Sequence, residues 1–372
     1  MENKDLQAVI SLRKELHEHP EPSEHEVETR RRLMEFLKKH TKVKIVDKGR
    51  WFYAIKEEEG AKETIAFRAD HDAIISEDGN AFHGCGHDGH SATLCGLAME
   101  LDNVETGKNI VYLFQHAEEN GAGAKECVEI FDEVDIDRIY GFHNWPHFEL
   151  GKPIVKKGTF MCASKGLTIS FLGKQSHASE PEHGVNPIYL IGKIIELVKP
   201  LSEFQGYVPS NWNGIDFSSM VLCTIIHVRL GEEGAFGVSP SRGEISLTLR
   251  GATLEDLNKL EESIKNFAMK ESKKEGMEVS FKISDEFPDT TNDEGEVERI
   301  VSIFEKHGVN PYWLEEPIRS SEDFGWYQKE VPGAFFYIGS GLDQPDLHTI
   351  EFDFPDSIIP EAISYLRWIA QD

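Results

Sequence analysis

The chain has no hydrophobic run long enough to cross a membrane. Its most apolar stretch lies around Met220 to Ile226, whereas a membrane-spanning helix needs about 20 apolar residues. The N-terminal residues mix acidic, basic and apolar side chains at helical spacing and contain no hydrophobic core of the kind found in signal peptides. We therefore expect a soluble, cytoplasmic protein.

Basic residues are also scarce. The 372 residues include 39 Lys and Arg against 66 Asp and Glu, which gives a formal net charge of −27. Such a chain repels nucleic-acid phosphates and anionic lipids, so we expect neither nucleic-acid nor membrane partners. Residues of the set AVILMFWYC make up 39% of the chain, which is enough for folded cores and excludes intrinsic disorder.

Cysteine is infrequent as well. The five cysteines are odd in number and include no C-x-x-C pair, which argues against a disulfide framework. We expect all five to be reduced and four of them to be buried packing residues. Cys85 differs, because it lies between histidines.

The order of predicted elements indicates an α/β fold. Apolar residues recur at helical spacing over residues 5–19 and 23–39, with two prolines between these helices. Strand-like runs at 64–70, 109–115 and 138–142 then alternate with helical patterns at 88–101 and 123–131. This alternation predicts a sheet of parallel strands.

The middle of the chain follows a different order. Strands and helices between residues 164 and 285 are predicted in the order βαββαβ, which is typical of a split-βαβ, ferredoxin-like sandwich. Later elements resemble the first part again. We therefore predict an inserted domain of residues 164–285, and a discontinuous domain formed by residues 1–163 and 286–372.

The segment from His83 to His90, HGCGHDGH, concentrates potential metal ligands. Three histidines, one cysteine and one aspartate are interleaved with three glycines, which permit tight backbone angles. Thiolate and imidazole are both good zinc ligands. A histidine-rich surface turn is the alternative, but the density of ligands favours a metal site.

Further candidate ligands follow the predicted strands of the first domain. They are Asp70 and Asp72, Glu118 and Glu119, His143, and His348. The carboxyl ends of parallel strands meet at one edge of a sheet, so we expect these side chains to converge. Alternating strand geometry places Asp70 and Asp72 on the same side. Taken alone, the glutamate pair is more typical of a helix start.

These residues suit metal-dependent hydrolysis. That reaction needs a cation to polarise a carbonyl and a carboxylate, itself not a ligand, to take a proton from water. Adjacent glutamates can divide these roles. One Cys, three His and one Glu suit two metals that share a bridging ligand.

Several longer segments carry a family resemblance over nearly the whole chain. They read LRKELHEHPEPSEHEVET, FRADHDA, HGCGHDGHSAT, FQHAEENGAGAKE, GFHNWP, GKQSHASEPEHGVNP, SSEDFGWY and DLHTIEFDF. Together they resemble the M20 metallopeptidase and aminoacylase family, specifically its amidohydrolase branch. The resemblance implies a zinc-exopeptidase-like α/β catalytic domain with an inserted ferredoxin-like lid and dimerisation domain.

The resemblance also implies the ligands of two divalent metal ions per subunit, with zinc expected first and manganese, cobalt or nickel as alternatives. These ligands are Cys85, His87, Glu119, His143 and His348. Cys85 is the expected bridge and Glu118 the expected general base. Asp72 is expected to orient a ligand imidazole, although it could simply cap a turn.

In the inserted domain the resemblance implies two residues that contact substrate. His177 matches a histidine that hydrogen-bonds the developing oxyanion, often across a dimer, and Arg250 matches an arginine that holds the substrate carboxylate. A solvated loop histidine and a surface arginine are the alternatives. A homodimer or homotetramer through this domain is expected.

The expected reaction is hydrolysis of N-acyl amino acids, acetyl or aryl, to a carboxylic acid and a free amino acid. Dipeptidase or carboxypeptidase action at the same site, and a non-catalytic ligand-binding relative, are the alternatives. The sequence departs from the family pattern at Gly237, where Asn is common, at His116, where Pro is usual, and in a short loop over residues 73–82. These departures bear on substrate identity rather than on the metals.

Overall fold

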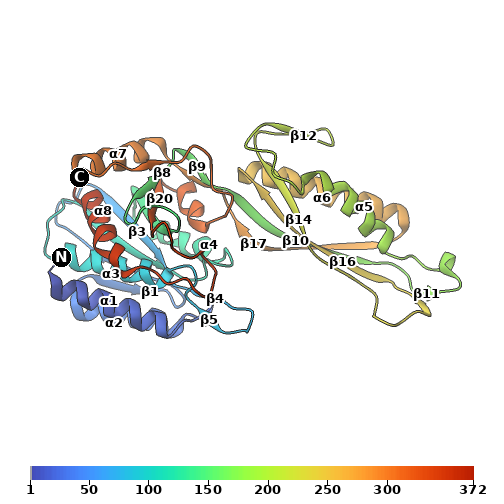
Figure 1. Ribbon diagram of the computed structural model, residues 1–372, viewed down its shortest axis with the longest axis horizontal. Coiled ribbons are helices and arrows are strands. Elements are labelled where there is room, and N and C mark those ends of the chain that lie inside the picture. The colour runs from blue at the N-terminus through green and yellow to red at the C-terminus, as the bar shows by residue number, and fades with distance from the viewer. Residues whose placement is uncertain (1) are drawn as a thin grey trace. The chain divides into compact units, whose positions relative to one another are not determined.

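The computed structural model describes residues 2–372, which fold into two compact units (Figure 1). The first unit contains the chain up to Phe160 together with Thr290–Pro317 and Asp323–Asp372. The second contains Met161–Asp289 and Ile318–Glu322. The expected insertion, residues 164–285, lies within the second unit.

An eight-stranded sheet forms the centre of the first unit, in the order β1-β2-β6-β3-β7-β20-β8-β19. The strands are β1 (Lys44–Asp47), β2 (Phe52–Lys56), β6 (Asn109–Gln115), β3 (Thr64–Asp70), β7 (Arg138–Trp145), β20 (Gly333–Gly339), β8 (Pro153–Val155) and β19 (Tyr312–Trp313). Neighbours among β6, β3, β7 and β20 are parallel. The pairs β1–β2, β2–β6 and β20–β8 are antiparallel. The sheet is therefore mixed.

The antiparallel edges correct the expectation of a parallel sheet. Only Lys48 to Trp51 separate β1 from β2, and a parallel crossover needs a dozen residues or more. Gly49, with φ +92°, supplies the left-handed turn that the short connection requires. The predicted strands are those at the parallel centre, where continuous burial makes the sequence signal strongest.

Helices cover the central sheet on both faces (Figure 1). On one face lie α1 (Asn3–Glu18), α2 (Val27–His40), α3 (His87–Leu101), α7 (Glu294–Lys306) and α8 (Ile359–Gln371), which share one hydrophobic core with the sheet. The short α4 (Gly123–Cys127) and the 3-10 helix η4 (Asp323–Lys329) pack against β6 and β7. Helix α3 is buried from His87 to Ala98, between the sheet and the outer helices. The helical part of the HGCGHDGH segment is therefore packed between the sheet and the outer helices.

Helix α2 begins four residues later than the sequence predicts, at Val27 instead of Ser23. Glu24 has a left-handed backbone, φ +69°, which cannot belong to an α-helix. Residues 19–26 consequently form a loop between α1 and α2. This loop reaches the loop that follows β3, because Pro22 bridges Ala73.

The second unit contains an antiparallel sheet in the order β14-β16-β10-β17. Its elements along the chain are β10 (Ala163–Leu172), α5 (Ile188–Val198), β14 (Val221–Leu230), β16 (Arg242–Gly251), α6 (Leu254–Glu275) and β17 (Glu278–Phe287). Alternate residues of β16 are buried. They join both helices in a hydrophobic core whose residues all come from this unit.

Short elements connect the main ones. In the first unit they include the hairpin of β4 (Ile74–Ile75) and β5 (Ala81–Phe82), the paired β9 (Gly158–Met161) and β18 (Thr290–Asn292), η1 (Val128–Asp132) and η5 (Asp356–Ile358). In the second unit they include β11 (Ser176–His177) paired with β15 (Val238–Ser239), β12 (Ser210–Trp212) paired with β13 (Ile215–Phe217), η2 (Pro181–His183) and η3 (Lys199–Leu201).

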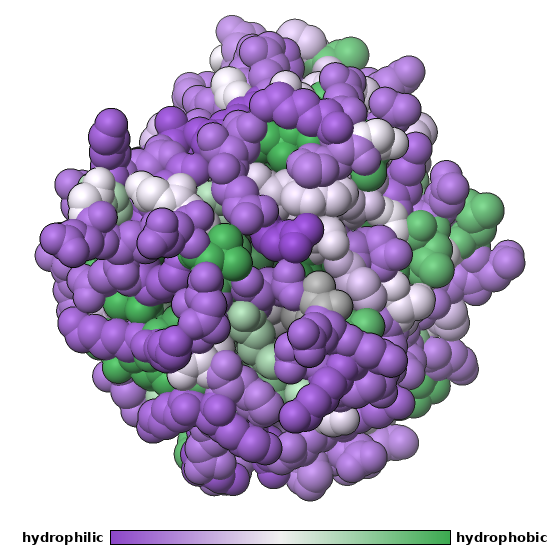
Figure 2. Space-filling view, turned by 90° about the vertical axis from the view of Figure 1, so that its left-hand side faces the viewer, coloured by the Kyte–Doolittle hydropathy of each residue, from purple (hydrophilic) through white to green (hydrophobic). Residues whose placement is uncertain are grey.

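The surface reflects the charged composition. Figure 2 shows a face on which hydrophilic residues predominate and hydrophobic residues form scattered patches. Across residues 2–372, no helix combines the length and the apolar character needed to span a membrane.

Candidate metal centre

The candidate ligands lie where the central parallel strands of the first unit end. Cys85 lies two residues before α3, and His87 is the first residue of this helix. Glu119 lies in the loop after β6, and His143 near the end of β7. His348 lies in the long loop after β20. This is the edge of the sheet at which the sequence predicts them to converge.

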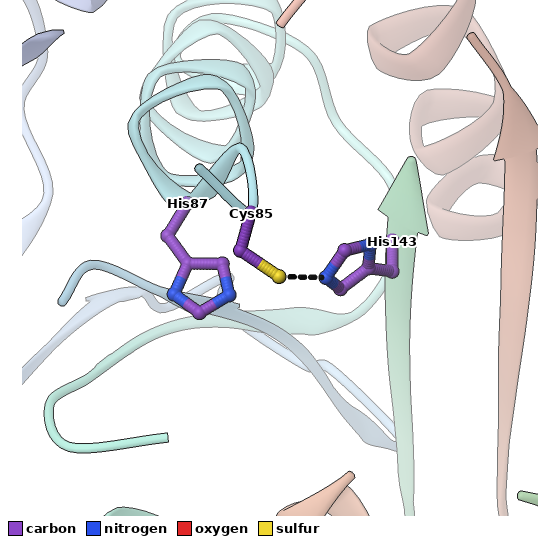
Figure 3. A group of neighbouring side chains, drawn as sticks. All are labelled: Cys85, His87 and His143. Carbon is purple, nitrogen blue, oxygen red and sulfur yellow. Dashed lines mark hydrogen bonds between the residues drawn. The ribbon is translucent and has the colours of Figure 1, made fainter. Parts of the chain in front are cut away.

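Two sets of donor atoms share Cys85. Those of Cys85, His87 and His143 lie within 4.8 Å of one another, and so do those of Cys85, Glu119 and His348. Figure 3 shows the first set, in which Cys85 Sγ lies 3.3 Å from His143 Nε2. In the second set, His348 Nε2 lies 3.5 Å from Glu119 Oε2. The arrangement suits two adjacent cations bridged by one thiolate.

A glycine permits the turn that presents Cys85 and His87. Gly86 has φ +96°, and a Cβ at this position would overlap the side chain of Asn144. Only glycine takes this conformation without strain and also leaves room for Asn144. The left-handed turn ends at the start of α3, so that the side chains on either side of Gly86 lie close together (Figure 3), with donor atoms within 4.8 Å of each other.

Asp72 orients His87. Its Oδ1 accepts a hydrogen bond from His87 Nδ1 at 2.9 Å, so the ring presents Nε2 to the pocket. That Nε2 is buried without a hydrogen-bond partner, as is Glu119 Oε1, and the two atoms are 3.8 Å apart. Two orphaned buried donor atoms facing each other fit a bound cation, because buried polar atoms otherwise carry a desolvation cost.

Asn144 orients His143. Its carbonyl accepts a hydrogen bond from His143 Nδ1 at 2.6 Å, which leaves His143 Nε2 facing Cys85. The backbone N–H of Asn144 donates to His90 Nε2 at 3.3 Å, and His90 Nδ1 is hydrogen-bonded to Asp70 Oδ1 at 2.7 Å. The buried His90 therefore links Asp70 to the backbone that holds His143, and a donor atom of His90 also lies within 4.8 Å of donor atoms of Asp70 and His87.

Carboxylates dominate the electrostatics of the site. Burial disfavours the His87 imidazolium, but the carboxylates of Asp70, Asp72 and Glu119 outweigh it and raise the pKa of His87 to about 10. Burial also raises the pKa of Glu119 to about 7. Asp70 Oδ2 lies 3.8 Å from His87 Nε2, so both strand-end aspartates reach this ring. A divalent cation would compensate this concentration of negative charge.

Of the remaining candidate ligands, the two histidines have the protonation state that metal binding requires, whereas the cysteine does not. Burial lowers the pKa of His143 and of His348, so both rings are neutral. Burial and the neighbouring Glu119 and Glu118 raise the pKa of the Cys85 thiol. A nearby cation is therefore needed to stabilise the Cys85 thiolate.

His348 is the most exposed of the candidate ligands, with 55% of its side chain accessible. It has φ +65°, and its backbone N–H donates to the carbonyl of Gly84 at 2.8 Å. This bond ties the loop after β20 to the Cys85 turn, which explains how a residue so distant in sequence joins the site.

Glu118 lies next to the ligands and is only 5% exposed. Its Oε2 is 3.9 Å from His87 Nε2, and its carboxylate lies within reach of both His87 and Glu119. The structure thus brings Glu118 together with two of the residues predicted to be ligands, His87 and Glu119.

A cavity of about 940 Å³ adjoins the site in the first unit. Glu119 and His348 line it together with the β4–β5 hairpin and Ile350. The hairpin lies in the short loop over residues 73–82, which therefore forms one wall of the cavity.

His177 and Arg250 belong to the second unit. His177 is exposed on β11, and the backbone N–H of Ser179 donates to its Nδ1 at 3.1 Å. Arg250 lies on β16, where its Nη1 donates to the carbonyl of Arg319 at 2.9 Å and to Ser321 Oγ at 3.0 Å. Within residues 2–372, no carboxylate forms an ion pair with Arg250.

Four residues around the site were not identified as functional from the sequence: Ser23, Glu26, His90 and Asn144. The first two lie in the segment PEPSEHE, and the others in HGCGHDGH and GFHNWP. All belong to segments that carry the family resemblance, which is the signal that could have identified them.

Comparisons with known proteins found similar sequences over most of the chain. A family model described as Peptidase family M20/M25/M40 matches residues 57–372. N-acetylcysteine deacetylase from Bacillus subtilis is 28% identical and covers 97% of this chain and 96% of its own length. N-acetyldiaminopimelate deacetylase from Listeria monocytogenes serotype 4a is 27% identical, with coverage of 97% and 98%.

Two solved structures share the fold over the full length. One is the YXEP protein of Bacillus subtilis, a dinuclear metal-binding peptidase from the M20 family, with a TM-score of 0.80, 25% identity and coverage of 100% of this chain and 98% of that one. The other is a putative aminohydrolase from methicillin-resistant Staphylococcus aureus, with a TM-score of 0.84, 24% identity and coverage of 99% and 97%.

Proposed function

The chain belongs to peptidase family M20/M25/M40, and on that premise we propose that it is a metal-dependent amidohydrolase of N-acyl amino acids. The products are a carboxylic acid and a free amino acid. The observation that carries the proposal is the pair of donor sets that share Cys85, with Glu118 beside them. Two relatives that align with nearly the whole chain are deacetylases of N-acetylated amino acids by name, which supports the substrate class.

Two divalent cations would be held by the two donor sets, one formed by Cys85, His87 and His143 and the other by Cys85, Glu119 and His348. Sulfur, nitrogen and oxygen donors in sets of three suit zinc, with room for water or substrate, and manganese, cobalt and nickel are alternatives. Bound there, the cations would polarise the scissile carbonyl and lower the pKa of a water molecule.

Glu118 is the general base. Its carboxylate lies outside the two sets that share Cys85, at the edge of the pocket. It accepts a proton from the attacking water and returns it to the leaving nitrogen of the amide. General acid–base catalysis of this kind contributes roughly 10²- to 10⁴-fold to a rate.

The second unit serves as a ferredoxin-like lid, with predicted boundaries at residues 164 and 285, while residues 1–163 and 286–372 form the catalytic domain. Its βαββαβ order and the sheet order β14-β16-β10-β17 support this. His177 Nδ1 accepts a hydrogen bond from the backbone N–H of Ser179, which leaves Nε2 as the ring nitrogen that can donate to an oxyanion. Arg250, which forms no ion pair with a carboxylate among the described residues, holds the carboxylate of the substrate.

The enzyme assembles as a homodimer, or a homotetramer, through this unit. Ile225, Ile226 and Val228 are exposed on β14, which lies at the edge of its sheet, and an apolar edge strand is suited to pair with another chain. The five free cysteines are consistent with a reducing, cytoplasmic location.

A substrate panel and a chelation experiment test the proposal. The purified protein is assayed with N-acetyl and N-aroyl amino acids and with dipeptides, before and after exhaustive chelation. We expect amide hydrolysis of N-acyl amino acids that chelation abolishes and that zinc, manganese or cobalt restores. Activity on dipeptides alone would refute the substrate class. Activity that survives with metal absence verified by mass spectrometry would refute the metal mechanism.

A further inference from the structure

The loop between α1 and α2 places a buried carboxyl group behind the proposed general base. Glu26 is 4% exposed, and its Oε1 accepts a hydrogen bond from the backbone N–H of Ala117 at 2.7 Å. Ala117 directly precedes Glu118. The contact therefore joins the N-terminal loop to the peptide that carries the base, although the two residues are 91 positions apart.

The backbone at Ala117 needs such support. Its φ is +47°, in the left-handed region that residues with a Cβ rarely adopt. The carbonyl of Ala117 accepts a hydrogen bond from Gly123 at 2.9 Å, and that of Glu118 accepts one from Gly121 at 2.8 Å. Strained conformations persist only where the surroundings fix them. Glu26 supplies the bond on the N–H side of Ala117.

The same loop also supports the other end of the turn. Ser23 Oγ donates to Asp72 Oδ2 at 2.7 Å, and that oxygen also accepts the backbone N–H of Glu119 at 3.0 Å. The N–H groups on either side of Glu118 are thus each held by a carboxyl group. The peptide of Glu118 is fixed between them.

We propose that Glu26 is a positioning residue, which fixes the left-handed turn at Ala117 and thereby aims the Glu118 carboxylate into the metal centre. This inference rests on the proposed function, because it assigns Glu26 an effect on proton transfer by Glu118. Glu26 itself belongs to none of the candidate donor sets among the described residues. Its loss should therefore lower kcat and leave KM nearly unchanged.

The hydrogen bond from the Ala117 N–H requires an acceptor oxygen at the right distance, and it does not require a negative charge on Glu26. Burial, aided by the neighbouring Asp72, raises the pKa of Glu26 to about 8, so the group is mostly neutral at pH 7 and accepts through its carbonyl oxygen. Glutamine has the same length and the same acceptor. Aspartate is one methylene shorter, and leucine has no acceptor.

Four variants separate positioning from general stability. Glu26→Leu removes the acceptor oxygen, Glu26→Asp moves it away from the Ala117 N–H because the side chain is shorter, and Glu26→Gln retains it. Glu21→Leu is the matched control, because Glu21 Oε2 accepts the backbone N–H of Thr29 at 2.7 Å, an equivalent bond near the start of α2 that does not involve the turn at Ala117. Glu26→Asp provides the test if Glu26→Leu fails to fold.

Two readouts are measured at pH 7 on the full chain. Steady-state kinetics are normalised to bound metal, and hydrogen–deuterium exchange follows the segment that contains Ala117. We expect Glu26→Leu and Glu26→Asp to lower kcat by about 10- to 100-fold, since a misplacement near 1 Å has effects of this size, with KM within about twofold. Exchange at Ala117 should rise in both. Glu26→Gln and Glu21→Leu should resemble the wild type in both readouts.

The inference is overturned if Glu26→Leu or Glu26→Asp keeps wild-type kcat, if Glu26→Gln falls as far as they do, or if Glu21→Leu matches them. Failure of the proposed function looks different, because the wild type would then hydrolyse no N-acyl amino acid. In that case the exchange experiment still decides whether Glu26 holds the turn.

Discussion

Asp72 Oδ1 lies 2.9 Å from His87 Nδ1, and this hydrogen bond determines which ring nitrogen faces the pocket. The carboxylate fixes both the tautomer and the rotation of the imidazole, a role that carboxylates commonly play behind metal-bound histidines. The same side chain also holds the backbone of Glu119. Asp72 thus couples two of the candidate ligands.

Removal of Asp72 should weaken metal binding. Asp72→Ala leaves the His87 ring free to rotate, and we expect metal affinity to fall by about 10- to 100-fold. Titration against a chromogenic chelator measures this. Ser23→Ala, which removes only one donor to Asp72, should have a smaller effect. Unchanged affinity in Asp72→Ala would contradict the role given to this residue.

The shared position of Cys85 predicts an unequal effect of ligand substitutions. Cys85→Ala removes a donor from both sets, whereas His348→Ala removes one from a single set. Because an incomplete set binds a cation weakly, we expect about two metal ions per chain in the wild type, about one in His348→Ala and well below one in Cys85→Ala. Elemental analysis after desalting checks this. Full loading of Cys85→Ala would exclude a bridging role.

The buried Glu26 predicts a pH dependence of stability. Its pKa is about 8 in the folded chain and close to 4.3 in an unfolded one. Because the pKa is higher in the folded chain, the protonated Glu26 stabilises the fold fully when the pH is below the pKa of the unfolded chain. This stabilisation is lost as the pH rises towards 8. The metal-free wild type should therefore lose stability relative to Glu26→Gln between pH 5 and pH 8, by on the order of a few kcal/mol. Urea unfolding at both pH values measures the difference, and parallel behaviour would contradict it.

Much of the site could be predicted because its signals are local. The HGCGHDGH segment carries two of the candidate ligands within three residues, and the strands at the centre of the sheet are mostly apolar. Three further ligands follow strands whose ends meet by topology. Sequence patterns of this kind need no knowledge of distant contacts.

The supporting contacts could not be predicted in the same way. The hydrogen bond between Glu26 and Ala117 joins a loop to a turn that is distant in sequence. Apolar periodicity predicts that α2 includes this loop, because nothing in the sequence indicates the left-handed backbone of Glu24. The strands β8 and β19 at the edge of the sheet were missed for a similar reason, since strands of two or three residues carry little pattern.

Substitution of Glu118 tests the central claim most directly. Glu118→Gln preserves shape but cannot accept a proton as a carboxylate does, whereas Glu119→Gln alters a proposed ligand and serves as the comparison. We expect Glu118→Gln to retain about two metal ions per chain while kcat on an N-acyl amino acid falls by on the order of 10²-fold or more, and Glu119→Gln to lose metal. Wild-type turnover in Glu118→Gln, or loss of its metal, would contradict the assignment of Glu118 as the base.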